Sequence, residues 1–185
     1  MHSLPTLETE RLKLRQLSVD DANSIQTLAS NRQIADTTIS IPHPYPNGEA
    51  ERYISKQIEE QKIDCAVTFA IELKSDAKLI GIVELRDIER EHFVAELSYW
   101  LTVSAWGKGY MSEATKPVLN FGFENLSLNK IYAYHMARNS ASGRVLQKNG
   151  FQPEGLLRQR VRKWGIFEDV ILLSILRQDW QNNKY

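Results

Sequence analysis

The sequence of 185 residues lacks several features that would assign it to a special class of protein. It has a single cysteine, Cys65, so it cannot form an internal disulfide bond. No apolar run reaches the roughly 20 residues that a membrane-spanning helix needs, and the start lacks the basic and then apolar pattern of a signal peptide. We therefore expect a protein of the cytoplasm with no membrane partner.

An excess of charge of one sign is also missing. Lys plus Arg and Asp plus Glu both number 23, so the formal net charge is zero. Without a positive field to attract a polyanion, we expect no general nucleic-acid binding. The histidines His43, His92 and His135 do not have the spacing of metal ligands, and we expect no metal site.

Two common nucleotide-binding motifs are absent as well. The pattern G-x-x-x-x-G-K-[ST] of phosphate-binding loops does not occur, and residues 107–112 lack the third glycine of the dinucleotide fingerprint. The sequence therefore indicates neither ATP nor NAD as a ligand held by these motifs.

The composition that is present is that of a globular protein, with 42% apolar and 25% charged residues in a length typical of one domain. No repeat or linker divides the chain, and we expect residues 1–185 to form a single domain. Polar and apolar residues alternate where strands are predicted, and recur at a spacing of three or four where helices are predicted. In chain order the patterns predict a strand at 11–17, helices from 22 and at 49–62, strands at 65–73, 79–85 and 92–103, a helix at 111–125, a strand at 130–137, a helix at 140–149, and strands that end with 167–175.

This order of elements indicates a mixed α/β fold in which the three strands between residues 65 and 103 form an antiparallel meander. Pro42, Pro44 and Pro46 predict a loop, because proline lacks the backbone donor that helices and strand ladders use. Pro117 lies inside a predicted helix, where we expect it to remove one backbone hydrogen bond and to bend the helix.

The segment at residues 106–112 joins a predicted strand to a predicted helix. Such a turn leaves several backbone N–H groups without carbonyl partners and directs them, with the helix dipole, at an anion. Gly107 and Gly109 would let the backbone approach that anion closely, and Lys108 adds positive charge. A helix entry that contains glycine and binds no ligand explains the same residues, so the segment alone leaves both interpretations open.

Four segments together resemble the GNAT superfamily of acyl-coenzyme A N-acyltransferases, in particular its branch of RimJ/RimL-type ribosomal-protein N-terminal acetyltransferases. Residues 7–15 (LETERLKLR) are similar to the opening strand of that branch, and residues 95–101 (AELSYWL) to its central strand. Residues 106–114 (WGKGYMSEA) resemble its pyrophosphate loop, and residues 139–151 resemble its last signature helix. The superfamily loop is usually written [Q/R]-x-x-G-x-[G/A], and this sequence departs from it with Trp106 in the first place and Met111 in the last.

The resemblance implies a mixed, mostly antiparallel sheet with helices on both faces and two central strands that splay apart at the cofactor site. It implies acetyl-CoA as co-substrate and no metal. The pantetheine arm would pair with the backbone of Leu101 and Val103, and Asn139 with Ser142 would hold it from the other side. The pyrophosphate would bind the loop formed by Trp106, Gly107, Lys108, Gly109, Tyr110, Met111 and Ser112.

In this family a free amine attacks the thioester directly in a ternary complex, so Cys65 is not needed as a nucleophile. The reaction requires an oxyanion donor, an acceptor for the amine proton and a donor for the leaving thiolate. Ser142 matches the serine of the branch's N-x-x-S pattern, which makes it the candidate proton donor. A hydroxyl that bonds nearby backbone early in a helix is the alternative interpretation.

The proton acceptor is less defined, because the branch does not keep one base at one position. Glu96 and Glu84 are the candidate carboxylates, since a hairpin that pairs Leu85 with Phe93 would put both on one face of the sheet. Solvated or ion-paired glutamates, an ordered water, and His135 on the strand at 130–137 remain alternatives.

The acceptor that the branch implies is the α-amine at the N-terminus of a protein, above all a ribosomal protein. A small amine such as a polyamine, an amino acid or an aminoglycoside is the second hypothesis, and a non-catalytic acyl-CoA-binding module is the third. Tyr45 and residues 158–165, with their basic cluster and Trp164, would border the substrate, and nucleic acid would be met only through a ribosomal substrate. The sequence is compatible with a homodimer and does not indicate an acyl-chain preference.

Overall fold

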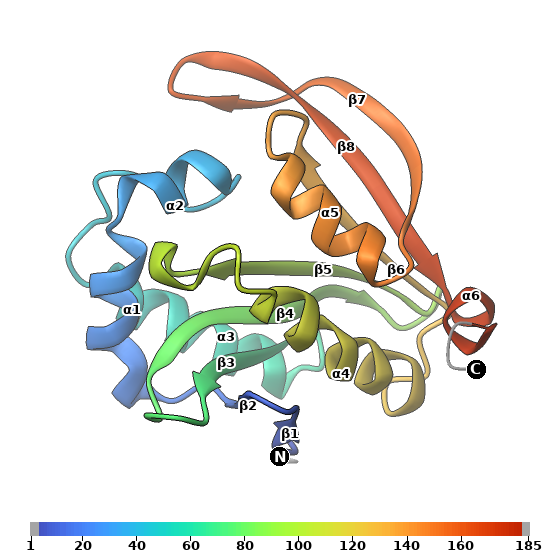
Figure 1. The fold of residues 1–185 in the computed structure, drawn as a ribbon, viewed down its shortest axis with the longest axis horizontal. Coiled ribbons are helices and arrows are strands. Elements are labelled where there is room, and N and C mark those ends of the chain that lie inside the picture. Colours follow the sequence, from blue (N-terminus) through green and yellow to red (C-terminus); the bar gives the residue numbers. More distant parts are fainter. Residues whose placement is uncertain (1–3, 183–185) are drawn as a thin grey trace.

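A single sheet organises the chain in this computed structural model, which describes residues 4–182. Within that range the sheet has eight strands in the order β1-β2-β3-β4-β5-β6-β8-β7 (Figure 1). Their bounds are Leu7–Glu8 (β1), Leu12–Gln16 (β2), Val67–Leu73 (β3), Leu79–Glu89 (β4), Val94–Leu101 (β5), Lys130–Met136 (β6), Gln152–Lys163 (β7) and Ile166–Leu176 (β8).

The helices of residues 4–182 lie between these strands or follow the last one. They are Ala22–Ala29 (α1), Arg32–Thr37 (α2), Glu49–Lys62 (α3), Tyr110–Glu124 (α4), Ser140–Lys148 (α5) and Arg177–Asn182 (α6). Two short 3₁₀ turns, Val19–Asp21 and Val103–Ala105, precede α1 and α4. None of the helices within residues 4–182 is long and apolar enough to cross a membrane.

Antiparallel pairing joins every neighbouring pair of strands except one. The exception is β5 with β6, which run parallel and are paired only at Val94 with Lys130, Ala95 with Ile131 and Glu96 with Tyr132. After this point β5 continues to Leu101 and β6 stays paired with β8, so the two central strands separate. The predicted mixed, mostly antiparallel sheet with splayed central strands is therefore confirmed.

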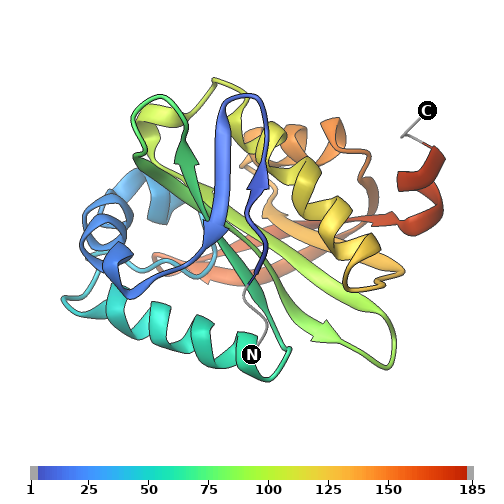
Figure 2. The ribbon, with the colours of Figure 1, turned by 90° about the horizontal axis from the view of Figure 1, so that it is seen from below.

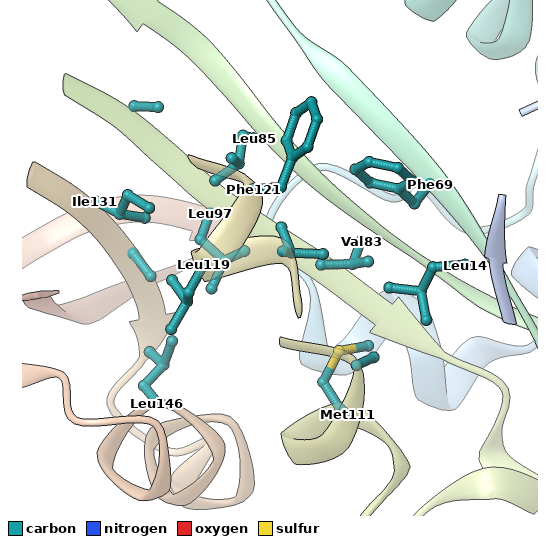
Figure 3. Close-up of a cluster of buried hydrophobic side chains, with 14 of the residues drawn as sticks. Leu14, Phe69, Val83, Leu85, Leu97, Met111, Leu119, Phe121, Ile131 and Leu146 are labelled. Carbon is teal, nitrogen blue, oxygen red and sulfur yellow. The ribbon is translucent and has the colours of Figure 1, made fainter. Parts of the chain in front are cut away.

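Two apolar cores cover the two faces of the sheet, as Figure 2 shows with α3 and α4 on opposite sides. On the α4 face, Phe69, Val83 and Leu97 pack with Phe121 and Leu119, and these side chains meet in Figure 3. The opposite core is smaller and is formed by α1, α3 and the strand residues Ala70, Ile82 and Trp100. The prediction of helices on both faces is thus confirmed. Successive side chains along a strand point to opposite faces of the sheet and so pack in different cores.

Most predicted elements are present with shifted ends, and three short ones were not predicted. The helix at 49–62 matches α3, whereas β1, α2 and α6 have no counterpart in the prediction. Cys65 precedes β3 and is exposed, so the strand predicted at 65–73 begins only at Val67. Pro117 lies inside α4, which nevertheless continues to Glu124.

The predicted register of the hairpin between β4 and β5 is wrong. Leu85 pairs with Leu97 rather than with Phe93, because β4 extends to Glu89 and Phe93 lies in the turn with a positive φ of 55°. The shift is an even number of residues, so it leaves side-chain parity unchanged. Glu84 and Glu96 still lie on the same face of the sheet, as predicted.

Candidate active site

The gap between β5 and β6 exposes one backbone edge of β5. The amide of Thr102 donates to the carbonyl of Ile80 at 2.7 Å, which makes these residues a hydrogen-bonded pair of the β4–β5 ladder. Because hydrogen-bonded pairs alternate along an antiparallel ladder, the backbone groups of Leu97, Tyr99 and Leu101 point away from β4 and toward the gap. An extended ligand could pair with this edge as an additional strand would.

Leu101 and Val103, the two residues predicted to contact the pantetheine arm, have different surroundings. Leu101 lies on the edge that faces the gap, and its carbonyl accepts a hydrogen bond from the indole Nε1 of Trp106 at 2.9 Å. Val103 has left the strand for a 3₁₀ turn, where its carbonyl accepts the backbone N–H of Trp106 at 3.1 Å. Leu97 and Tyr99 face the gap along β5 and were not singled out from the sequence, because strand parity alone does not indicate which neighbour is missing.

The glycines of the predicted loop adopt a backbone that favours glycine. Gly107 has φ 73° and Gly109 has φ 80°, both in the left-handed region. Gly109 is the N-cap of α4 and has no side chain to bond the first N–H groups of the helix. Those groups and the positive end of the helix dipole are thereby directed out of the helix start.

The side chains of the loop point to several places. Met111 is 5% exposed within the α4 core, and the ring of Tyr110 lies 4.5 Å from the guanidinium of Arg11. Backbone amides, rather than these side chains, are therefore what the segment offers to an anion. The loop residues that line the cavity described below are Trp106, Gly107, Gly109, Tyr110, Met111 and Ser112.

Helix α5 begins on the other side of the gap with the predicted Asn139 and Ser142. Asn139 is the N-cap of α5, and its Oδ1 accepts the backbone N–H of Ser142 at 3.2 Å. Its Nδ2 donates to the carbonyl of Thr37, the last residue of α2, at 2.9 Å. Asn139 therefore orients the first turn of α5 and ties it to α2.

A tyrosine that sequence reasoning missed lies against Ser142. The hydroxyl of Tyr99, on β5, is 3.0 Å from Ser142 Oγ and donates to the Ser142 carbonyl at 3.2 Å. Burial raises the pKa of Tyr99, although the hydrogen bond with Ser142 opposes it, so the phenol stays protonated at neutral pH. The contact joins β5 to α5 across the gap.

One cavity of about 1040 Å³ is lined from both sides of the sheet. Its walls include the α4 loop and the start of α5, and also α3 and the loop that follows α2. Glu84, Glu96, Tyr99 and Ser142 all line it. The structure thus brings the predicted carboxylates and the predicted serine to the same cavity, although they lie up to 58 residues apart in sequence (Glu84 to Ser142).

The two candidate carboxylates are buried and belong to a row of polar groups. Arg86 lies between them, with Nη2 at 2.6 Å from Glu96 Oε1 and Nη1 at 3.8 Å from Glu84 Oε1. Tyr53, on α3, donates its hydroxyl to Glu84 Oε2 at 3.0 Å. Ser98 also bonds Glu84 and is its partner across the hairpin. Arg86 and Tyr53 were not predicted, since only the tertiary structure brings α3 to this face.

Burial dominates the acidity of both carboxylates. Glu84 is 6% exposed and Glu96 is 8% exposed, and desolvation raises the pKa of each above its ordinary value. Arg86 opposes this rise at both sites by stabilising the charged form. A carboxylate with a raised pKa is better matched to accept a proton near neutral pH.

The side chain of His135 is buried and fixed by contacts with neighbouring residues. It is 7% exposed, and one of its ring nitrogens, Nδ1, lies 2.9 Å from the Met136 carbonyl. A Cβ at Gly143 would come within 2.8 Å of its Nε2, so the ring packs closely on α5. Within residues 4–182 no group of three or more His, Cys, Asp or Glu residues is arranged to hold a metal ion.

The hairpin of β7 and β8 extends beyond α5 (Figure 1), and a side chain at its tip contacts α2. Trp164 donates its indole N–H to Asp36 at 2.6 Å, and Lys163 donates to the carbonyl of Ile41 at 2.7 Å. Trp164 is 45% exposed, so its indole lies at the surface and is anchored there by this hydrogen bond. Ile41 lines the cavity, so the hairpin supports the loop that follows α2 and forms part of the cavity wall.

Comparisons with known proteins agree with this geometry. The profile of the acetyltransferase (GNAT) domain matches residues 11–152. The N-acetyltransferase p20 of Bacillus licheniformis, itself uncharacterized, is 32% identical over 178 residues, which cover 96% of this chain and 99% of that protein.

Two solved structures have the same fold with different acceptors. The spermidine N-acetyltransferase from Vibrio cholerae, solved with CoA and spermine, is 28% identical with a TM-score of 0.83 and covers 94% of this chain and 100% of that one. The ribosomal-protein-S5-alanine acetyltransferase from Vibrio fischeri is 28% identical with a TM-score of 0.84 and covers 95% and 98%. Similarity of this extent supports a common donor chemistry and leaves the acceptor to be argued separately.

Proposed function

Because the chain belongs to the GNAT acetyltransferase family, we propose that it transfers an acetyl group from acetyl-CoA to a primary amine. The acceptor that we propose first is the N-terminal α-amine of a protein, with ribosomal proteins as the leading class. The amine attacks in a ternary complex, and no covalent enzyme intermediate is required.

The observation that carries the proposal is the separation of β5 from β6 beside an uncapped helix start. The edge formed by Leu97, Tyr99 and Leu101 suits the amide groups of a pantetheine arm, which can pair as a strand does. Gly109 leaves the first amides of α4 unbonded by any cap side chain, and these suit a diphosphate. The exposed edge of β5 and the start of α4 line the same cavity, so one coenzyme molecule could contact both.

Different residues of the chain would then bind different parts of the coenzyme. The backbone from Gly107 to Ser112 would hold the diphosphate, and Lys148, which also lines the cavity, adds positive charge beside it. Asn139 acts by holding Ser142 and α5 in place, because both of its polar side-chain atoms already have partners. Acetyl-CoA supplies the thioester carbonyl that the amine attacks.

Proton transfer completes the reaction. The amine loses one proton as its nitrogen bonds to the carbonyl carbon, and Glu96 is the acceptor that we propose, directly or through a water, with Glu84 as the alternative. The sulfur gains one proton as the carbon–sulfur bond breaks, and Ser142 Oγ is the proposed donor, held by the Tyr99 hydroxyl at 3.0 Å. Both steps are general acid–base catalysis by positioned groups.

A small amine is the second candidate, and one observation favours it. Glu84 and Glu96 are buried and line the cavity, where carboxylates could bind the ammonium groups of a short polyamine. The acceptor of the relative from Vibrio cholerae is spermidine. A peptide N-terminus offers only one such ammonium, so the two acceptors differ in the charge that they bring into the cavity.

A thiol-release assay with matched acceptors tests the proposal. One arm uses peptides with a free N-terminus, each paired with the same peptide blocked by acetylation, and the other arm uses spermidine and monoamines. Release with free peptides alone supports the first acceptor, and release with spermidine alone supports the second. Coenzyme A binding in calorimetry without release from any acceptor would instead support a non-catalytic acyl-CoA-binding module.

A further inference from the structure

The N-terminal segment that precedes β2 is bound to the start of α4. Glu113, in the first turn of α4, accepts the hydroxyl of Thr9 at 2.6 Å and the backbone N–H of Arg11 at 2.9 Å through one oxygen. Its other oxygen accepts Nε and Nη2 of Arg11 at 2.7 and 2.6 Å. Two segments about 100 residues apart in sequence are thus joined at one carboxylate.

Arg11 also reaches the loop that we propose for the diphosphate. Its Nη1 donates to the carbonyl of Lys108 at 3.1 Å, and its guanidinium lies 4.5 Å from the centre of the Tyr110 ring. A Cβ built on Gly109 would lie 3.6 Å from Arg11 Nη2. One side chain therefore contacts Lys108 and Tyr110 and lies beside Gly109 between them.

The charges of Glu113 and Arg11 would affect the binding of an anionic ligand at the loop. The negative charge of Glu113 in the first turn of α4 interacts favourably with the helix dipole. The same carboxylate lies close to the proposed diphosphate site, where its charge would repel the ligand. Burial raises the pKa of Glu113, yet the hydrogen bonds from Thr9 and Arg11 outweigh it and hold the pKa below its ordinary value. Glu113 is therefore ionised, and the paired guanidinium neutralises it.

We propose that Arg11 is a positioning residue for the coenzyme, because it neutralises Glu113 and fixes the backbone of residues 108–110. This inference rests on the proposed function, since it assigns acetyl-CoA to that loop. It gives the opening segment, residues 7–15, a role in donor binding in addition to the pairing of β1 and β2 in the sheet. Arg11 acts through the loop and takes no part in the transfer of the acetyl group.

Calorimetric titration with coenzyme A and steady-state kinetics of the full chain test the role of Arg11. In Arg11→Gln we expect the Kd for coenzyme A and the KM for acetyl-CoA to rise by about 10-fold, while kcat stays within about twofold of the wild type. Arg11→Lys keeps the charge and loses the bidentate geometry, so we expect an intermediate Kd.

A matched control comes from β2, the strand that follows Arg11. Arg15 makes ion pairs with Asp21 and Glu72 at 2.6 Å but does not contact the loop. Arg15→Gln should lower the unfolding temperature and leave the Kd for coenzyme A unchanged. The comparison separates a general loss of stability from an effect on the loop.

The outcomes distinguish this inference from the proposed function. A wild-type Kd in Arg11→Gln, or an equal loss of affinity in Arg15→Gln, would overturn the positioning role. Arg11→Lys that binds no better than Arg11→Gln would overturn the part played by the charge. A wild-type chain that does not bind coenzyme A would overturn the proposed function itself.

Discussion

The hydroxyl of Tyr99 lies 3.0 Å from the hydroxyl of Ser142, across the gap that opens between β5 and β6. Tyr99 comes from the strand that ends at this gap, and Ser142 from the first turn of the helix on its far side. The contact gives the serine a fixed rotamer at the edge of the cavity. It therefore defines where a proton donor for the leaving thiol would stand.

Ser142→Ala removes the proposed proton donor. We expect kcat to fall by roughly 100-fold, the lower end of the usual effect of general acid–base catalysis. The Kd for coenzyme A should change less than about threefold, because Asn139 bonds the backbone N–H of Ser142 and the cap of α5 survives. Ser140→Ala, an exposed serine in the same turn, is the control, and a wild-type rate in Ser142→Ala would discard the acid role.

Tyr99→Phe removes the hydroxyl that holds Ser142. We expect kcat to fall by about 5- to 10-fold, with the KM for acetyl-CoA nearly unchanged, because one neutral hydrogen bond contributes on the order of 1 kcal/mol. The double variant with Ser142→Ala should be no slower than Ser142→Ala alone, since the tyrosine acts through the serine. Additive losses in this cycle would mean that Tyr99 has an independent role.

Gly109→Val should abolish or strongly weaken acetyl-CoA binding without unfolding the chain. Valine is strained at φ 80°, and the loop can relieve the strain only by moving the amides of the helix start. We expect the Kd for coenzyme A to rise by at least about 10-fold, measured by calorimetry. Gly48→Val is the matched control, because Gly48 is the N-cap of α3 at φ 76°. Equal affinity in the two variants would remove the loop from the mechanism.

Glu96→Gln tests the proposed base through the pH dependence of kcat/KM. Because the pKa of Glu96 is raised by burial, the carboxylate of the wild type is lost as pH falls through a value above that of an ordinary glutamate. We expect the pH profile of kcat/KM to fall on its acidic side at this pH. In Glu96→Gln this acidic limb should disappear, and kcat/KM should fall by about 100-fold. Glu84→Gln should retain the limb. A limb that survives in Glu96→Gln would transfer the role to Glu84 or to a water.

Glu84→Gln should stabilise the fold above neutral pH. The folded pKa of Glu84 is raised, so the folded state holds this proton more tightly, and stability falls as pH rises from the unfolded pKa through the folded one. Glutamine cannot ionise and can still accept from Tyr53. The gain should therefore be larger at pH 8 than at pH 4, and about 1 kcal/mol would raise the unfolding temperature by about 2–4 °C. A variant less stable than the wild type at pH 8 would contradict the prediction.

Local patterns predicted much of the fold. The spacing of apolar residues predicted α3 over its whole length, and prolines predicted the loop before it, because these signals act over a few residues. The short α2 and α6 lack the length that produces a period, and they depend on contacts such as that of Trp164 with Asp36. The register of β4 with β5 was predicted wrongly, because the turn that sets it places Phe93 in an unfavourable backbone region.

The candidate site divides in the same way. The glycines of the α4 loop, Asn139 and Ser142 could be identified because their roles depend on backbone geometry and on local spacing, which a short stretch of sequence carries. Arg11 and Tyr99 could not, since their partners are 102 and 43 residues away.

By itself the sequence determined most of the elements, the loop with its two glycines, and the family to which the chain belongs. Only the tertiary structure decided that β5 parts from β6 after Glu96, that Arg86 stands between two buried carboxylates, and that Arg11 holds the loop. The physical reason is that backbone preference acts between near neighbours, whereas burial, charge pairing and strand order are set by residues far apart in the chain.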